Sequence, residues 1–398
     1  MNPHISQLHS YPFEKLQQIK QALNPLQDKP HIALSVGEPK HATPDFVRQS
    51  IRTNVDGLMK YPTTRGTPEL RTAIADWLIR RFNLTSSALD IEQNILPVSG
   101  TREGLFSIAQ TVIDRHKSPI VIMPNPFYQI YEGAALLAGA EPYYLNTCAE
   151  NEFLPDLDSI PDHVWKRCQL FYSCSPGNPH GRIIPLDMLQ RLIELAMRHD
   201  FVIAADECYS EIYLDELKPP AGLLQAAAAM GNDSFSHCLV FHSLSKRSNA
   251  PGLRSGFVAG DAQLIRGFFQ YRTYHGCALP VHTQMASTLA WKDEDHVRTN
   301  RILYRDKFRA VTNTLKGAWR VTPPEASFYL WPETPLDDQQ FAKMLYQQEN
   351  ITVLPGSFLS REVAGINPGS NRVRIALVAP LDECIDAAQR IQHYFSTL

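Results

Sequence analysis

A regular alternation of short apolar runs and helical patterns between residues 94 and 260 is the feature that most constrains this chain. The predicted strands are 94–98, 119–123, 141–145, 168–173, 201–205, 238–242 and 255–259, and the predicted helices are 101–114, 127–138, 184–199 and 209–213. Strands that alternate with helices predict a largely parallel sheet covered by helices on both faces. Ligands bind such sheets beyond the carboxyl ends of the strands, so polar motifs at those ends are the candidates for a site.

The flanking segments predict a second, smaller α/β unit. A helix is expected from Pro44, with Thr43 as its N-cap. Further helices are expected over 69–83, 261–275, 281–292, 295–317 and 337–348, and further strands over 321–331, 351–354 and 371–378. We therefore expect an N-terminal arm with part of the small domain at 1–44, a large domain at 45–275 and a small C-terminal domain at 276–398.

Composition narrows the functional class. A net charge of -3 gives no electrostatic reason to expect nucleic acid or an anionic membrane as a partner. No apolar run approaches the roughly 20 residues that span a bilayer, and the N-terminus lacks the basic and apolar segments of a secretory signal. The seven cysteines form no C-x-x-C pair, which indicates reduced thiols rather than disulfides or a metal site. These features predict a cytoplasmic enzyme.

The stretch 242–256, HSLSKRSNAPGLRSG, carries the first candidate chemistry. Lys246 follows Ser243 and Ser245 and precedes Arg254 by eight residues. A solitary lysine is ordinarily a solvated surface group, but these hydroxyls and this guanidinium suit a phosphate. A lysine amine beside a phosphate site is typical of a Schiff base with pyridoxal phosphate (PLP), whose ring acts as an electron sink.

The S-x-S-K pattern ending at Lys246, followed by Arg254, resembles the lysine motif of fold-type I, PLP-dependent aminotransferases of class I and II. Further motifs match that family in chain order: G-E-P at 37–39, Y-x-x-x-x-G-x-x-x-L-R at 61–71, S-G-T-R at 99–102, N-P-x-G at 178–181, D-E-x-Y at 206–209 and R-I-A at 374–376. The resemblance implies the α/β fold of that family, in which a large PLP-binding domain has a mostly parallel sheet flanked by helices. It also implies a smaller α/β domain and a homodimer with shared active sites.

The resemblance implies a role for each matching residue. Lys246 would hold PLP and move the proton, Asp206 would pair with the pyridine nitrogen, and Tyr209 would donate to the phenolic oxygen; these three are the predicted catalytic residues. The predicted cofactor-binding residues, one of them reaching across the dimer, are Gly100, Thr101, Arg102, Tyr128, Asn178, Asp206, Tyr209, Ser243, Ser245, Lys246, Arg254 and Tyr61. The predicted substrate-binding residues are Gly37, Asn178 and Arg374, and Arg374 would clamp the α-carboxylate.

Simpler interpretations stay open for several of these positions. Thr101 and Glu207 can each be a plain helix cap. Alternation along the strand can place Arg372 and Arg374 on one solvated face. His180 stands where the family usually has threonine, and we interpret it as tolerated variation.

Several longer segments resemble one branch of the family. YPFEKL, SVGEPKHATPDFV, YPTTRGTPELRTAIADWL, SGTREGLF and ASFYLWPE are similar to the bacterial succinyldiaminopimelate aminotransferases of lysine biosynthesis. That resemblance implies amino transfer from N-succinyl-LL-2,6-diaminopimelate to 2-oxoglutarate. Because such a substrate carries distal carboxylates, a second cationic side chain is expected, and Arg65 and Arg102 are the candidates.

Three alternatives remain open. An aromatic, kynurenine or acetylornithine-type aminotransferase would share every motif. A PLP-dependent cystathionine β-lyase would use the same lysine without a 2-oxo acid acceptor. A non-catalytic regulator on this fold would need an added DNA-binding module, for which the sequence offers no spare N-terminal domain.

Overall fold

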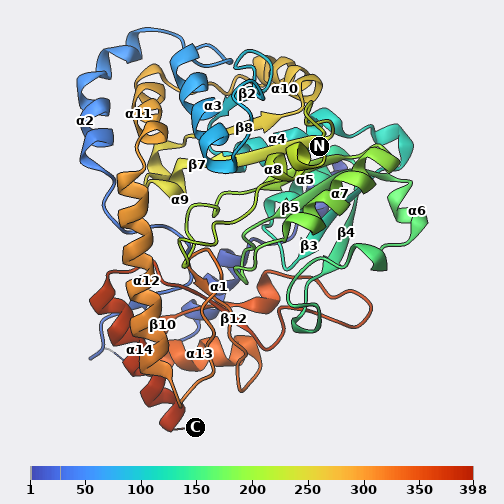
Figure 1. Ribbon diagram of the computed structural model, residues 1–398. Coiled ribbons are helices and arrows are strands. Elements are labelled where there is room, and N and C mark those ends of the chain that lie inside the picture. Colours follow the sequence, from blue (N-terminus) through green and yellow to red (C-terminus); the bar gives the residue numbers. More distant parts are fainter. Residues whose placement is uncertain (1, 27, 398) are drawn as a thin grey trace.

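A computed structural model describes residues 2–26 and 28–397 and shows a large lobe built on one sheet, with a smaller lobe beside it (Figure 1). The strands of the large sheet stand in the order β2-β8-β7-β6-β5-β3-β4. They are β2 (Ile95–Val98), β3 (Ile120–Asn125), β4 (Glu141–Asn146), β5 (Cys168–Cys174), β6 (Val202–Asp206), β7 (Cys238–Ser243) and β8 (Gly256–Gly260). β3 to β7 pair in parallel, whereas β8 is antiparallel to both β2 and β7. The predicted, mostly parallel sheet is confirmed.

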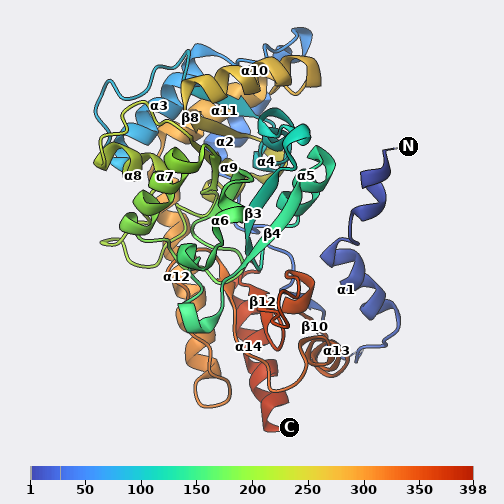
Figure 2. The same ribbon diagram turned by 90° about the vertical axis from the view of Figure 1, so that its right-hand side faces the viewer.

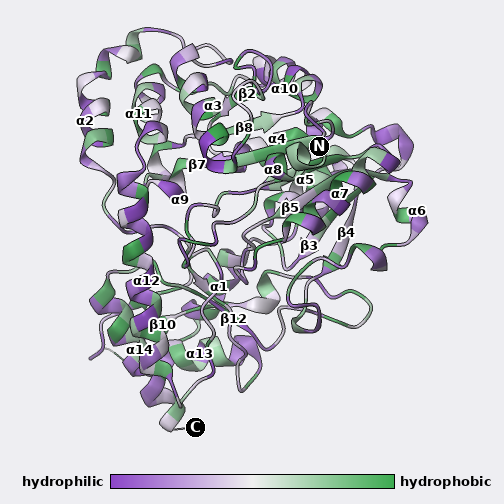
Figure 3. Ribbon diagram, viewed as in Figure 1, coloured by the Kyte–Doolittle hydropathy of each residue, from purple (hydrophilic) through white to green (hydrophobic). Residues whose placement is uncertain are grey.

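The sequences of these strands are continuous apolar runs because both faces of the sheet are buried. In β6, Val202 and Ala204 belong to the core on one face of the sheet, and Ile203 and Ala205 belong to the core on the other. A sheet covered on both sides needs apolar residues at successive positions, without alternation. Figure 3 shows hydrophobic residues concentrated along the central strands and hydrophilic residues on the outer parts of the surrounding helices.

Helices form a layer on each face of the sheet. One layer contains α3 (Pro68–Phe82), α7 (Leu186–His199), α8 (Leu223–Ala229) and α11 (Val281–Lys292), and the other contains α4 (Thr101–Val112), α5 (Ile130–Ala138) and α10 (Ala262–His275). The remaining helices of this lobe are α2 (Asp45–Thr53), α6 (Asp162–Trp165) and α9 (Leu244–Arg247). α11 falls in the predicted small domain 276–398 but packs against α2 and α3 of the large lobe (Figure 1).

The small lobe combines both ends of the chain. β1 (Ile32–Ala33) pairs in parallel with β10 (Ile351–Thr352), and β12 (Val373–Ala376) lies between β11 (Leu354–Pro355) and β9 (Tyr329–Leu330). Its helices are α13 (Asp338–Glu349) and α14 (Leu381–Ser396), and α12 (Asp295–Leu315) runs from the large lobe to pack on α14 (Figure 1). The N-terminal arm carries α1 (Pro12–Gln21), a helix that the prediction lacks, along one side of the molecule (Figure 2).

Two local predictions near the large lobe are wrong. Thr43 does not cap α2, because its hydroxyl donates to the carbonyl of Asn249 (2.6 Å) and Pro44 occupies the N-cap position. Residues 209–213 form turns instead of a helix, and the segment ends in a β-bridge from Tyr213 to the small lobe.

The predicted strand 321–331 is reduced to β9. Pro323 and Pro324 lie inside that run, and proline lacks the amide hydrogen that a strand ladder needs.

Among the described residues, no helix is long and apolar enough to cross a membrane. All seven cysteines are free thiols.

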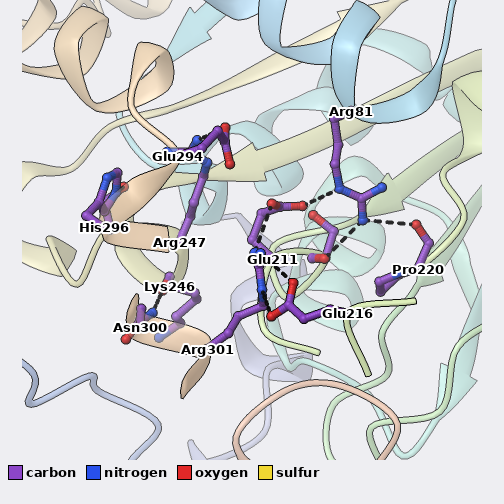
Figure 4. Close-up of polar contacts among 12 residues, drawn as sticks. Arg81, Glu211, Glu216, Pro220, Lys246, Arg247, Glu294, His296, Asn300 and Arg301 are labelled. Atoms are coloured by element: carbon purple, nitrogen blue, oxygen red, sulfur yellow. Dashed lines mark hydrogen bonds and ion pairs between the residues drawn. The ribbon is translucent and has the colours of Figure 1, made fainter. Parts of the chain in front are cut away.

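A buried ionic network joins α3, the turn after β6 and α12 (Figure 4). Glu211 is 3% exposed, and its carboxylate accepts from Nε of Arg81 (2.7 Å) and lies 3.8 Å from Arg301. Arg301 also binds both oxygens of Glu216 at 2.9 Å. The network therefore fixes the turn that carries Tyr209 against a helix of each lobe.

We expect Glu211→Gln to destabilise the protein by about 3 kcal/mol, because removal of one member of a buried ion pair leaves the charge of its partner, Arg81, uncompensated. Glu216→Gln is the matched control: its side chain is 37% exposed, and loss of such a pair costs about 1 kcal/mol or less. Urea unfolding of the two variants measures the difference. Equal losses in both variants would contradict the view that burial makes Glu211 the centre of the network.

Candidate active site

The carboxyl edge of the large sheet borders a cavity of about 680 Å³ that the small lobe and the N-terminal arm close from the other side. Twelve of the residues predicted from the sequence line it: Gly37, Thr101, Arg102, Tyr128, Asn178, Asp206, Tyr209, Ser243, Ser245, Lys246, Arg254 and Arg374. They come from segments up to 337 residues apart in the chain (374 − 37). The fold thus brings together the residues that the motifs singled out.

One part of the cavity is suited to an anion. Ser243 ends β7 and Ser245 lies in the first turn of α9, while Arg254 stands two residues before the antiparallel strand β8 and so reaches the same edge. Gly100 caps α4 with φ +80°, and a Cβ there would overlap the guanidinium of Arg254. The first amides of a helix lack intrahelical acceptors and favour negative charge. Hydroxyls, a guanidinium and a helix N-terminus therefore converge on one point, which we call the phosphate cradle (Gly100, Thr101, Ser243, Ser245 and Arg254).

Lys246 lies beside this cradle with its amine largely withdrawn from water. The Nζ atom donates to the carbonyl of Gly37 and lies 5.3 Å from the centre of the Phe328 ring. Burial is the main cause that lowers the pKa of Lys246 to about 8; the positive charges of Arg374 and Arg254 lower it further, and Cys208 opposes them. A lysine with this pKa offers a substantial neutral fraction near physiological pH, as a nucleophile or base requires.

The main chain of Lys246 is also hydrogen-bonded, to a residue of α12 (Figure 4). Asn300 of α12 donates from Nδ2 to the carbonyl of Lys246 (3.4 Å). The Oδ1 atom of Asn300 lies 2.8 Å from Nδ1 of His41 and accepts from Asn249 at 3.0 Å. Asn300 therefore links the segment that carries Lys246 to the loop that contains His41. The carbonyl of Gly37, just before this loop, accepts the hydrogen bond from the Lys246 amine.

Asp206 ends β6 and is 5% exposed. The hydroxyl of Tyr131 donates to its Oδ2 atom (2.6 Å), and the amide of Cys208 donates to Oδ1 (3.3 Å). Burial raises the pKa of Asp206, and these hydrogen bonds act in the opposite direction. Tyr209, three residues on, shares a hydrogen bond of 2.9 Å with the hydroxyl of Tyr329.

Arg374 is 5% exposed, so the solvated-face interpretation is wrong for this residue. Its guanidinium donates to Oδ1 of Asn178 (3.0 Å) and to the carbonyl of Ser35 (2.9 Å), and it lies 4.4 Å from the centre of the Tyr329 ring. Its Nε atom is buried without a partner among the described residues. Arg372 points elsewhere and pairs with Glu333. Only Arg374 of the two therefore offers a guanidinium to the cavity.

Other predicted residues lie outside the cavity of their own chain. Tyr61 is fully exposed on the surface. Arg65 donates to the carbonyl of Glu92 and stacks over Phe269 at 4.1 Å, so within one chain it does not reach the cavity. Glu207 pairs with His242 and accepts from a backbone amide, which is a structural role.

His180 also lies outside this cavity. Burial lowers the pKa of His180 to about 3, with a further contribution from Arg182. The ring stacks on Phe153 and its Nδ1 atom accepts from the amide of Arg182 (3.1 Å). The neutral, packed ring supports the interpretation of tolerated variation.

Sequence reasoning missed four residues at or behind the site: Tyr11, Tyr131, Tyr329 and Asn300. Tyr131 lies three residues after the predicted Tyr128, and Tyr329 lies within ASFYLWPE, so an aromatic residue close to a recognised position was the available signal. Tyr11 belongs to the arm and lines the cavity beside Arg102. Nothing in the local sequence distinguishes Asn300 from the other polar residues of α12.

One group of possible metal ligands, Glu103, His275 and Cys277, lies elsewhere. Glu103 already binds the buried guanidinium of Arg272 and the hydroxyl of Ser107. Because a buried cation occupies this carboxylate, the group is better explained as an ion pair than as a metal site.

The titration of Lys246 is directly testable. We expect the apoenzyme amine to react with an acylating reagent at a rate that rises with pH and is half-maximal near pH 8, since only the neutral form is nucleophilic and the pKa is about 8. Pulse labelling at a series of pH values, followed by peptide mass spectrometry, measures the midpoint. A midpoint near that of an ordinary lysine, about 10.4, would show that the amine is not desolvated.

This chain resembles known proteins in both sequence and structure. The family model described as aminotransferase class I and II matches residues 29–391. An LL-diaminopimelate aminotransferase of Desulforudis audaxviator is 29% identical over 394 residues, which is 98% of this chain and 96% of that protein. The crystal structure of an aminotransferase from Neisseria meningitidis has a TM-score of 0.95 at 47% identity and covers 99% of this chain and 100% of its own.

A probable N-succinyldiaminopimelate aminotransferase of Thermus thermophilus shares the fold at 23% identity, with a TM-score of 0.84 over 96% of this chain and 99% of its own. The predicted fold-type I architecture is confirmed by these likenesses. Class I and II aminotransferases use pyridoxal phosphate and act on amino acids and 2-oxo acids, and this chain belongs to that family.

Proposed function

We propose that this aminotransferase moves the amino group of N-succinyl-LL-2,6-diaminopimelate to 2-oxoglutarate. The observation that carries the proposal is the presence of two guanidinium groups besides that of Arg254 in the phosphate cradle: Arg374 from β12 and Arg102 from α4. Arginine binds carboxylates bidentately, so a substrate and an acceptor with a carboxylate at each end suit this arrangement. The name of the Desulforudis relative supports a diaminopimelate skeleton.

The cavity fits pyridoxal phosphate. The phosphate cradle supplies hydroxyls and Arg254, and the space that a Cβ at Gly100 would fill is taken by that guanidinium. The buried carboxylate of Asp206 is the partner that a pyridine nitrogen needs, and the Tyr128 ring is available to stack on it. When bound, the cofactor supplies an electron sink for the negative charge that develops at the substrate α-carbon.

The chain's own groups provide binding and proton transfer. Lys246 holds the cofactor through its amine and, when free, uses neutral Nζ to take the proton from the substrate α-carbon. Its lowered pKa keeps this base available at neutral pH. Arg374 and Asn178, already joined by a 3.0 Å hydrogen bond, receive the α-carboxylate and fix the direction of the bond that loses its proton.

Arg102 is the residue that we propose for the distal carboxylate. It is exposed, lines the cavity, and lies between the rings of Tyr11 (6.0 Å) and Tyr128 (5.9 Å). Its Nε atom donates to the hydroxyl of Tyr128 (2.7 Å), which leaves the terminal nitrogens for a ligand. Arg65, the other candidate, is engaged with Phe269 and Glu92 in its own chain.

A second candidate donor is free LL-2,6-diaminopimelate, which is the substrate in the Desulforudis relative's name. Glu38 lines the cavity and is exposed, so its carboxylate can pair with a free distal ammonium. The succinylated donor lacks that charge. Aromatic, kynurenine and acetylornithine-type donors would use the same contacts to the cofactor and to the α-carboxylate. A cystathionine β-lyase would release pyruvate and would need no 2-oxo acid acceptor.

We infer that the active site is completed by a second copy of the chain. Val55, Leu58, Met59 and Tyr61 expose between half and all of their side chains in one short segment, and such apolar exposure marks an interaction surface. This supports the role suggested for Tyr61, which would reach the phosphate held by the neighbouring subunit.

A substrate panel tests the proposed donor. Purified enzyme loaded with PLP is mixed with single donors, and the cofactor absorbance reports conversion to the pyridoxamine form. We expect fast conversion by glutamate and N-succinyl-LL-2,6-diaminopimelate and slow conversion by phenylalanine, with Arg102→Met slowing the succinylated donor about tenfold or more, the loss expected for a charged hydrogen bond. Fast conversion by LL-2,6-diaminopimelate alone, sensitive to Glu38→Gln, would establish the second candidate instead.

The phosphate cradle gives a further prediction. Gly100→Ala should raise the dissociation constant of PLP about tenfold or more, because the new methyl group displaces Arg254 from the anion. Gly276→Ala is the matched control: its φ of +83° is nearly the same, but a Cβ there meets nothing within 4 Å. Fluorescence titration of the two apoenzymes with PLP measures the effect. Equal weakening in both variants would attribute the loss to backbone strain and not to the cradle.

A further inference from the structure

Two buried tyrosines stack directly behind Asp206. Tyr131 of α5 and Tyr172 of β5 have ring centroids 4.5 Å apart and an interplanar angle of 11°, and both are 0% exposed. The hydroxyl of Tyr172 donates to the carbonyl of Leu105 (2.6 Å). The hydroxyl of Tyr131 donates to Oδ2 of Asp206 at the same distance. The two rings are therefore alike in burial and packing, but their hydroxyls donate hydrogen bonds to different acceptors.

The bond from Tyr131 is short and fixes one oxygen of Asp206. A separation of 2.6 Å lies in the range of charge-assisted O–H···O⁻ hydrogen bonds. The other oxygen, Oδ1, accepts a longer bond of 3.3 Å from the amide of Cys208, and the Cys208 side chain is a further donor to this carboxylate. The bond from Tyr131 to Oδ2 is thus the shorter of the two measured bonds that orient the carboxylate.

Tyr131 also acts against the burial of the charge. Burial raises the pKa of Asp206, whereas donors at Cys208 and Tyr131 and the charge of His242 lower it. Burial holds the pKa of Tyr131 itself well above its usual value, so the hydroxyl keeps its proton. The other titratable groups around the carboxyl are neutral thiols and phenols: Cys174, Cys208, Tyr128 and Tyr209.

We propose that Tyr131 is a positioning residue that holds Asp206 as an oriented carboxylate for the ring nitrogen of pyridoxal phosphate. The inference rests on the cofactor placement described under the proposed function. A hydrogen bond to the anion lowers its affinity for a proton. The proton shared between the ring nitrogen and Asp206 therefore stays on the nitrogen, where it strengthens the electron sink.

The test is the ¹⁵N chemical shift of enzyme reconstituted with ¹⁵N-labelled pyridoxal phosphate and measured at neutral pH. In Tyr131→Phe we expect the signal to move from its wild-type value, which reflects a proton shared between the ring nitrogen and Asp206, toward that of neutral pyridine, because the proton shifts onto the more basic carboxylate. Tyr172→Phe removes the equivalent hydroxyl from the stacked neighbour and should leave the signal at the wild-type value. Thermal unfolding confirms that both variants are folded.

A second variant, expected to move the ¹⁵N signal in the opposite direction, keeps the test valid if Tyr131→Phe does not fold. 3-Fluorotyrosine at position 131 preserves the ring and makes its hydroxyl a stronger donor, so the signal should move further toward the protonated ring. Identical signals in Tyr131→Phe and Tyr172→Phe, or no response to 3-fluorotyrosine, would overturn the role of Tyr131. A wild-type signal in Asp206→Asn would show instead that the cofactor nitrogen does not face Asp206, and would overturn the cofactor placement itself.

Discussion

Parallel pairing of β3, β5, β6 and β7 is the constraint on which the site depends, because it brings the carboxyl ends of these strands to one edge of the sheet. Asp206 ends β6 and Ser243 ends β7, so they become neighbours without any long loop. β8 runs in the opposite direction, and this antiparallel step delivers Arg254 at its start to the same edge. A fully parallel sheet would place that residue at the far end of the strand.

Burial at this edge then sets the chemistry of each group. Burial lowers the pKa of Lys246 to about 8. Burial raises the pKa of Asp206, and hydrogen-bond donors at Cys208 and Tyr131 oppose that rise. Arg374 cannot give up its proton, and it reaches the cavity with a buried nitrogen that no described residue satisfies. An amine with a lowered pKa, a hydrogen-bonded carboxyl group and a guanidinium with a nitrogen that no described residue satisfies therefore lie in one cavity, a combination that suits amino transfer.

The strands of the sheet can be predicted from the amino-acid sequence because a strand buried on both faces needs a continuous apolar run. Turn residues separate each run from the next. It also predicts most of the cavity residues, since Asp206, Ser243 and Lys246 sit immediately after such runs. Contacts made between elements are harder to predict. Tyr131 and Asp206 meet only because α5 packs on the sheet at β3 and β4, and Asn300 meets Lys246 only through the path of α12. The failed cap at Thr43 has the same origin, because its hydroxyl is taken by Asn249, 206 residues away.

The assignment of the cofactor to Lys246 has one clear competitor within the chain. Lys307 is 2% exposed, and burial lowers its pKa to about 8 as well, but its amine donates to the carbonyl of Val378 (3.3 Å) and does not line the cavity. Borohydride reduction of the PLP-loaded enzyme, followed by proteolysis and peptide mass spectrometry, identifies the lysine that holds the cofactor. The account predicts a phosphopyridoxyl group on Lys246 alone. The same group on Lys307, or on any lysine outside the cavity, would contradict it.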